Sequence, residues 1–141
     1  MFTDQSFQTN ANELNLIDIP NTQDFKMGKG IATIFKQKYN GVKELLNQHK
    51  NIGQVAILQR NNRYIFYIIT KQKYYHTPTR ENFELALSDL RRVCEELNVK
   101  HLCLPRIGAG LDKLPLEFVH VTIKKVFEGC DMMMTMFYFK R

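Results

Sequence analysis

"LPRIGAGLDKLP", residues 104–115, is the most informative stretch of the sequence. It begins as the end of an apolar strand, passes through Gly108 and Gly110, and carries one acid, Asp112, before a helical pattern starts. A glycine-rich turn between a strand and a helix presents backbone N–H groups that can bind a phosphate. The stretch therefore predicts a strand-to-helix junction with an anion-binding turn.

A second glycine-bearing junction, "MGKG" at residues 27–30, precedes apolar residues at helical spacing over residues 31–39. In open α/β sheets, ligands bind beyond the carboxyl ends of the strands, where helix N-termini carry partial positive charge. Two such turns suit a ligand with two phosphates. A single G-x-G more often serves only a tight turn, so the spacing leaves both interpretations open.

The remaining patterns predict strands interleaved with helices. Strands are expected over 14–19, on both sides of Asn61 and Asn62, over 99–105 and over 132–139. Pro20 ends the first of these strands, and the last is expected to be apolar and covered on both faces. Helices are expected over 42–48, over 83–97, and from Pro115, in the first helical turn, to Gly129. This alternation indicates an α/β layered fold whose sheet is mixed because of the hairpin.

The length and composition suit one domain covering residues 1–141, with a short or irregular N-terminal strand. The chain has 141 residues, of which 44% are hydrophobic and 24% charged, as in globular domains. Its first ten residues lack the pattern of a signal peptide, and its apolar runs are too short to span a bilayer. We expect a soluble protein, cytoplasmic or nuclear, with no membrane partner.

The charge and the cysteines limit the possible partners. A net charge of +6 favours anionic partners but does not distinguish a nucleic acid from a phosphorylated small molecule. No nucleic-acid-binding motif is visible, so we do not expect such a partner. Cys94, Cys103 and Cys130 are an odd number without a C-x-x-C pair, which argues against a disulfide framework. His101 and Cys103 share a face of a predicted strand, but two ligands do not form a zinc site, and we expect a buried thiol, an edge histidine and no metal.

Four blocks in this order resemble the macrodomains of the terminal ADP-ribose protein glycohydrolase (O-acetyl-ADP-ribose deacetylase) type. They are "KMGKGIATIFKQKYNGVKELLNQ" (26–48), "YIFYIITK" (64–71), "HTPTRENFELAL" (76–87) and "LPRIGAGLDKLPLEFV" (104–119), within a similarity that runs from about Asp24 to Phe139. The resemblance implies a three-layer α/β/α macrodomain sandwich with a mixed central sheet. It also implies ADP-ribose, O-acyl-ADP-ribose or mono-ADP-ribosylated proteins as partners and no cofactor.

The resemblance also implies roles for particular residues. It suggests that Gly28, Gly30 and Ile31 surround the distal ribose, and that Ile107, Gly108, Ala109 and Gly110 surround the pyrophosphate. It places Thr22, Asp24, Met27, Pro105 and Leu111 among the ligand contacts. Asp112 matches the catalytic acid of the family, whereas the residues alone allow either that role or a helix cap.

The sequence departs from the family at the nucleophile. The family uses a lysine that attacks the anomeric carbon of the distal ribose, and the resemblance puts that position at Thr77, where we expect a helix cap with Pro78 as the first helical residue. Asp4 is the acid available near the N-terminus for the adenine. Two functions follow: a monomeric hydrolase of ADP-ribosyl esters (O-acyl-ADP-ribose or ADP-ribosylated glutamate) that uses Asp112, or a non-catalytic module that binds ADP-ribose.

Overall fold

The computed structural model describes residues 2–6, 15–22, 40–60, 63–71, 79–105 and 114–138, with six strands and three helices assigned among them. In chain order these are β1 (Phe2–Ser6), β2 (Asn15–Thr22), α2 (Val42–Leu46), β3 (Val55–Arg60), β4 (Arg63–Lys71), α3 (Arg80–Glu96), β5 (His101–Pro105), α4 (Leu116–Val126) and β6 (Met133–Tyr138).

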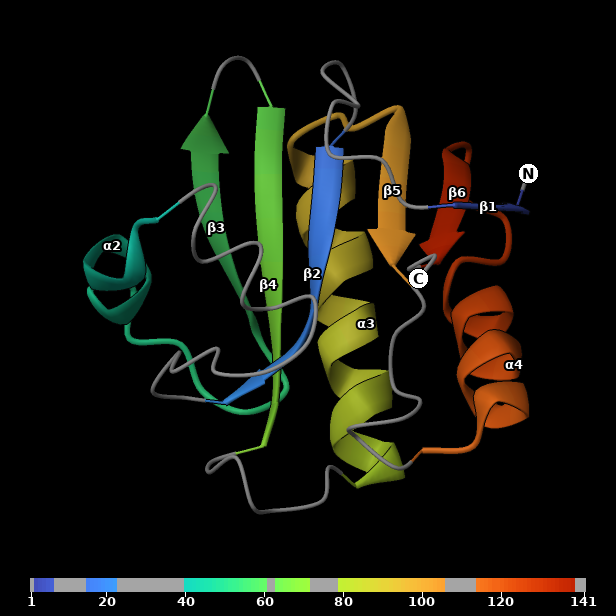
Figure 1. The fold of residues 1–141 in the computed structure, drawn as a ribbon, viewed down its shortest axis with the longest axis horizontal. Coiled ribbons are helices and arrows are strands. Elements are labelled where there is room, and N and C mark those ends of the chain that lie inside the picture. The colour runs from blue at the N-terminus through green and yellow to red at the C-terminus, as the bar shows by residue number, and fades with distance from the viewer. Residues whose placement is uncertain are drawn as a thin grey trace.

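The strands form one mixed sheet in the order β1-β6-β5-β2-β4-β3 (Figure 1). Every neighbouring pair is parallel except β3 and β4, which are antiparallel and meet at Arg60 and Arg63. This register leaves residues 61–62 as a two-residue connection, as the asparagine pair predicted. The expected mixed α/β sheet is therefore confirmed.

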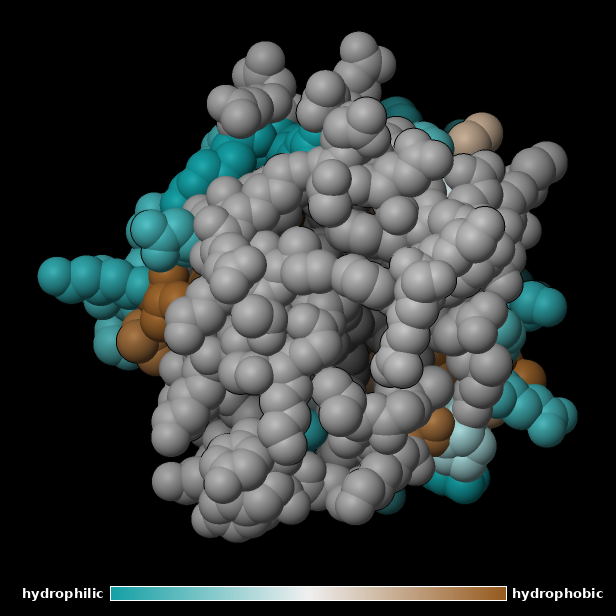
Figure 2. Space-filling view, viewed as in Figure 1, coloured by the Kyte–Doolittle hydropathy of each residue, from teal (hydrophilic) through white to brown (hydrophobic). Residues whose placement is uncertain are grey.

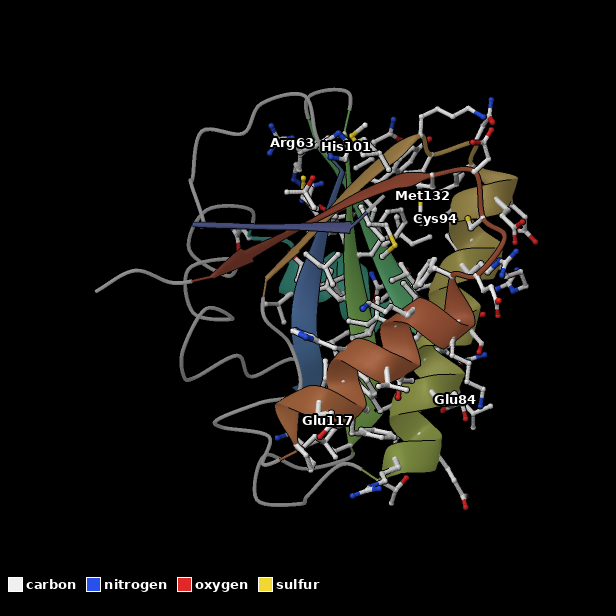
Figure 3. The ribbon with its side chains drawn as sticks, turned by 90° about the vertical axis from the view of Figure 1, so that its right-hand side faces the viewer. Arg63, Glu84, Cys94, His101, Glu117 and Met132 are labelled. Carbon is white, nitrogen blue, oxygen red and sulfur yellow. The ribbon has the colours of Figure 1, made fainter. Side chains whose placement is uncertain are left out.

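Helices α3 and α4 cover one face of the sheet (Figures 1 and 3). The period of the predicted 83–97 helix is confirmed by α3, whose buried stripe is Phe83, Ala86, Leu87, Leu90, Val93 and Cys94. This stripe packs with Phe66 and Ile68 of β4 and with Leu102 and Leu104 of β5 in one hydrophobic core. The helix expected over 31–39, on which a second helical layer would depend, lies outside the described residues.

Contacts between polar groups fix α3 against α4. The Arg91 guanidinium donates to the carbonyls of Val126 and Glu128, both at 2.8 Å, and so binds carbonyls at the end of α4. In the last turn of α4, Lys125 Nζ lies 2.6 Å from Oε1 of Glu84 in α3. Since the carboxyl-terminal carbonyls of a helix have no intrahelical donors, the Arg91 contact satisfies groups that would otherwise need water.

The start of α3 corrects one prediction. Thr79, and not Thr77, is the N-cap: its Oγ1 accepts a hydrogen bond from the Asn82 N–H at 3.0 Å. The helix then begins at Arg80, so Pro78 is not its first helical residue. The two threonines flank the proline, and only the one followed directly by the helix can reach an N–H in the first turn.

Further boundaries, and the covering of β6, differ from the sequence prediction. Strand β2 continues through Pro20 to Thr22, with register shifts against β4 after Asp18. Pro115 precedes α4 as its N-cap, with an extended backbone, instead of lying in its first turn. Met133 is 50% exposed, so the start of β6 is not covered on both faces. Helix α2 ends at Leu46, two residues before the predicted end.

The described residues that are visible in Figure 2 lie at the margin of the face shown. There, hydrophilic side chains predominate and small hydrophobic areas lie beside them. Among the described residues, the large hydrophobic side chains that are exposed come from different elements: Leu46, Leu85, Val121 and Met133. Within the same part of the chain, no helix has the length and apolar character needed to cross a membrane.

Candidate functional site

Three neighbouring parallel strands end at one edge of the sheet. Strand β5 ends at Pro105, β2 at Thr22 and β4 at Lys71, and their order in the sheet is β5-β2-β4. The segments 106–113, 23–39 and 72–78 leave the sheet from these carboxyl ends. Both glycine-bearing turns, "MGKG" and "IGAG", belong to segments that begin at this edge.

Strands β2 and β5 separate toward this edge. Among the described residues they pair only at Asn15 with Leu102 and at Leu16 with Cys103. From Ile17 onward β2 remains paired with β4 alone, and its lower part bends away from β5 in Figure 1. Pro20 fits this arrangement, because a residue without an N–H is tolerated where one side of the strand has no ladder to complete.

The connections from these two strands run in opposite directions. After β2 the chain continues to β3 and β4 on one side, and after β5 it continues to β6 on the other. A pair of adjacent parallel strands with diverging connections is a topological switch point, where ligands of open α/β sheets bind. The edge between Thr22 and Pro105 is therefore the candidate site.

The described residues include only part of the predicted site. Thr22 and Pro105 are the last residues of β2 and β5, and so lie at the candidate edge. Asp4, the candidate acid for the adenine, lies in β1 and pairs in register with Met136 of β6. The other predicted site residues lie outside the described residues: Asp24, Met27, Gly28, Gly30, Ile31, Thr77, Ile107, Gly108, Ala109, Gly110, Leu111 and Asp112.

Lys71 also lies at this edge, although it is not among the site residues predicted from the sequence. Lys71 is the last residue of β4 and pairs in register with Thr22 of β2. Alternation along β4 puts Lys71 on the sheet face of Ile65, Tyr67 and Ile69, opposite the face that packs on α3. The signal that could have located it is the position of a basic residue directly after the apolar run of a strand.

The end of β4 is fixed on both sides. On one side the Gly53 N–H donates to the Ile69 carbonyl at 2.7 Å, and the Ile69 N–H donates to the Gln54 carbonyl at 3.0 Å. On the other side β2 pairs through Thr22. The backbone of Lys71 is therefore held by a rigid element, as precise placement of a reactive side chain requires.

A second polar cluster lies at the amino ends of the strands. His101 Nε2 is 2.9 Å from Thr135 Oγ1 and 3.9 Å from Cys103 Sγ. In Figure 3, Arg63 and His101 lie at one end of the molecule. Glu117, near the start of α4, lies at the opposite end. The expected buried thiol is confirmed for Cys103, but β5 is an interior strand, so His101 is not an edge histidine.

The chemistry of this second cluster does not suit a nucleophile. Burial raises the pKa of the Cys103 thiol to about 12, although the nearby positive charge of Arg63 opposes the shift. Burial also lowers the pKa of His101. At neutral pH both groups are uncharged. Over the described part of the chain, no three His, Cys, Asp or Glu side chains are close enough to share a metal ion.

Comparison with solved structures identifies the fold. The macrodomains of DarG from Mycobacterium tuberculosis and Thermus aquaticus superpose with TM-scores of 0.85 and 0.83, each at 24% sequence identity and covering 100% of this chain and 99% of the other. The structure of Thermosipho africanus DarTG in complex with ADP-ribose superposes with a TM-score of 0.78 at 17% identity over 93% of this chain and 40% of that one. The fold and the site at its switch point define a macrodomain.

Relatives found by sequence comparison show to which branch of the macrodomains this chain belongs. The human and bovine proteins named ADP-ribose glycohydrolase OARD1 are each 47% identical over 116 residues, which is 82% of this chain and 76% of the relative. The chain therefore belongs to the terminal ADP-ribose glycohydrolase branch of the macrodomains. A Thermus aquaticus protein named DNA ADP-ribosyl glycohydrolase is 32% identical over 114 residues, 74% of this chain and 32% of that longer protein. No family model matches the sequence.

Proposed function

We propose that this protein binds ADP-ribose at the edge between β2 and β5 and hydrolyses ADP-ribosyl linkages there. The observation that carries the proposal is the switch point at Thr22 and Pro105, from which both glycine-bearing segments begin. The 47% identity to relatives named ADP-ribose glycohydrolases supports hydrolysis as the reaction.

Charge in the same segments supports an anionic ligand. Residues 23–39, 72–79 and 106–113 contain seven of the 20 basic residues of the chain and only two of the 14 acidic ones. Most of the net charge of +6 is therefore carried by segments that leave the carboxyl ends of β2, β4 and β5. A ligand with a diphosphate is attracted to such a concentration of positive charge.

The glycine turns supply the binding groups in this proposal. Backbone N–H groups of Ile107, Gly108, Ala109 and Gly110 donate to the pyrophosphate, and Gly28, Gly30 and Ile31 surround the distal ribose. Glycine permits the close approach of a main chain to a ligand, which a side chain would obstruct. Thr22, Asp24, Met27, Pro105 and Leu111 complete the contacts to the ligand.

Asp112 supplies acid–base catalysis. It lies two residues after the pyrophosphate turn, so its carboxylate is within reach of the distal ribose. A carboxylate there can accept a proton from water or from a ribose hydroxyl, and return it to the leaving group. The substrates in this proposal are ADP-ribosyl esters: O-acyl-ADP-ribose and ADP-ribosylated glutamate.

Lys71 supplies the amine that the family uses as a nucleophile. Thr77 has no amine, whereas Lys71 stands in register with Thr22 at the candidate edge. For an ester on the anomeric carbon of the distal ribose, as in ADP-ribosylated glutamate, Nζ of Lys71 attacks that carbon and gives up a proton to Asp112, while the bond to the ester oxygen breaks and the carboxylate leaves. Ring opening gives a Schiff base, and water then releases ADP-ribose and regenerates the amine.

The alternative is a module that binds ADP-ribose without turnover. Calorimetric titration with ADP-ribose, followed in the same samples by a time course on O-acetyl-ADP-ribose and on glutamate-linked ADP-ribosylated protein, separates the two. ADP-ribosylated DNA belongs in the panel because one relative is named for that substrate. Binding with release of ADP-ribose supports the hydrolase, binding without release selects the module, and no binding overturns the site.

A further inference from the structure

The outer edge of β3 is closed by side chains of the chain itself. Strand β3 is the last strand of the sheet and pairs with β4 on its inner side. On an edge strand, every second residue directs its N–H and C=O outward, where they can pair with another strand. In β3 these residues are Val55, Ile57 and Gln59.

The carboxamide of Gln48 makes both hydrogen bonds of the central residue. Its Nε2 donates to the Ile57 carbonyl at 2.6 Å, and its Oε1 accepts from the Ile57 N–H at 2.8 Å. This is the pair of bonds that an opposing residue of an antiparallel strand would make. One side chain therefore takes the place of a strand residue at the centre of the edge.

Two other side chains extend this closure. Asp89 of α3 accepts from the Val55 N–H through Oδ2 at 2.9 Å, while its Oδ1 binds Arg92 at 2.7 Å. Arg60 donates to the Gln59 carbonyl at 2.9 Å and pairs with Glu44 of α2 at 2.7 Å. Outward backbone groups of all three residues are thus bonded to side chains from the turn after α2, from α3 and from β3 itself.

The turn that carries Gln48 is held in place by α2. Leu45 is fully buried, and the Gln48 N–H donates to the Leu45 carbonyl at 3.2 Å. Gln48 Nε2 also lies 3.3 Å from the Glu44 carbonyl. Because the turn is anchored, the carboxamide loses little freedom when it binds β3, which strengthens the closure.

We propose that Gln48, assisted by Asp89 and Arg60, prevents β3 from pairing with β3 of a second copy of this chain. A second copy is the occupant that the geometry favours. With a two-fold axis at Ile57, the Ile57 N–H of one copy would bond the Ile57 C=O of the other, and the reverse. In the monomer these two backbone groups are bonded to the carboxamide of Gln48. The stretch "VAIL" at 55–58 is apolar and includes the β-branched residues Val55 and Ile57, which makes such pairing favourable once the edge is open.

The test is the oligomeric state of Gln48→Ala in the full chain. Light scattering coupled to size-exclusion chromatography over a range of concentrations should find a monomer for the parent and a concentration-dependent dimer for Gln48→Ala. Gln59→Ala is the matched control, since it removes an exposed glutamine from the same strand and leaves every backbone contact. It should stay monomeric.

Hydrogen exchange tests whether the dimer forms through β3. The Ile57 amide should exchange faster in dilute Gln48→Ala than in the parent, and regain protection as the dimer forms. Gln48→Glu keeps the acceptor for the Ile57 N–H but lacks the donor for the Ile57 carbonyl. The Gln48→Glu protein should therefore dimerise less than Gln48→Ala. It provides a second test if Gln48→Ala fails to fold. A parent that dimerises through β3, or a folded Gln48→Ala that stays monomeric with an exposed Ile57 amide, overturns the proposal. ADP-ribose titration of each variant tests the proposed function separately.

Discussion

Thr22 and Lys71 lie opposite each other at the carboxyl ends of two neighbouring parallel strands, β2 and β4. This pairing brings a basic side chain to the sheet edge at which the first glycine-bearing segment begins. Lys71 and Thr22 are 49 positions apart in the sequence, so their proximity depends on β2 entering the sheet between β5 and β4. The same relationship gives the first prediction.

Lys71→Ala should reduce release of ADP-ribose from glutamate-linked ADP-ribosylated protein by about 10³-fold, or ~4 kcal/mol of transition-state stabilisation, because the covalent nucleophile is lost. Borohydride reduction during turnover should link ADP-ribose to Lys71 in the parent, and peptide mass spectrometry identifies the modified residue. Lys73→Ala is the control and should keep both activity and adduct. An adduct on Lys73, or full activity of Lys71→Ala, would remove Lys71 from the mechanism.

Asp112→Ala should abolish measurable turnover while changing the affinity for ADP-ribose by no more than about tenfold, ~1.4 kcal/mol. The reason is that the proposed binding groups are backbone amides, which the substitution leaves in place. The expected loss in kcat is roughly 10²–10⁴-fold, the usual contribution of an acid–base group. Calorimetry and a product time course on the same preparation measure the two effects. Undiminished turnover contradicts the assignment.

The three cysteines should react in a fixed order. Burial raises the pKa values of Cys94 and Cys103 to about 12, so both are protonated at pH 7.5 and shielded from reagents. Cys130 is only partly buried. Iodoacetamide should therefore modify Cys130 first, and all three at similar rates in denaturant. Peptide mapping after timed quenching measures the order, and early modification of Cys103 would show that its environment is more open than described.

His101 should make the protein less stable in acid. Burial lowers its pKa in the folded state, whereas the unfolded chain has the ordinary value of about 6.5. The unfolded chain therefore binds the proton more readily, and stability is lost as the pH falls below about 6.5 through the folded-state pKa. His101→Gln, which can still bond Thr135, should show a smaller fall in urea midpoint between pH 7.5 and 5.5. An equal fall in both proteins would assign the acid sensitivity to other groups.

Alanine substitutions at Gly41 and Gly129 should distinguish the stability lost to steric crowding from the stability lost to a strained backbone conformation. Gly41 and Gly129 both have positive φ, 82° and 75°, but a Cβ on Gly41 would lie 2.8 Å from atoms of Leu58 and Arg60, whereas none lies within 4 Å at Gly129. Gly129→Ala should cost about 1–2 kcal/mol of unfolding free energy from the strained φ. Gly41→Ala should cost about 1–3 kcal/mol more, because Leu58 is buried and its side chain must move. Urea denaturation of both variants measures the difference, and equal losses would show that the neighbours of Gly41 relax freely.

The local elements followed from the sequence because their signals are local. The period of the buried stripe from Phe83 to Cys94 identified α3, and the asparagine pair at 61–62 identified the β3–β4 hairpin. Local signals determine the helix boundaries less strictly. Thr77 and Thr79 both precede the helical pattern, and only the hydrogen bond to the Asn82 N–H distinguishes them. The glycine turns also pointed to an anion site from sequence alone, since glycine permits main-chain approach wherever the turn lies.

Which elements meet was decided by the tertiary structure. The sequence contains the residues of "MGKG", Lys71 and "IGAG" but not the strand order β5-β2-β4, which makes the ends of these three strands neighbours. The same is true of Gln48 and Ile57, whose hydrogen bonds close the sheet edge. Periodicity and turn chemistry depend on residues a few positions apart, so the sequence reveals them directly. Strand order depends on how apolar faces from distant segments pack together, and that is settled only when the whole chain folds.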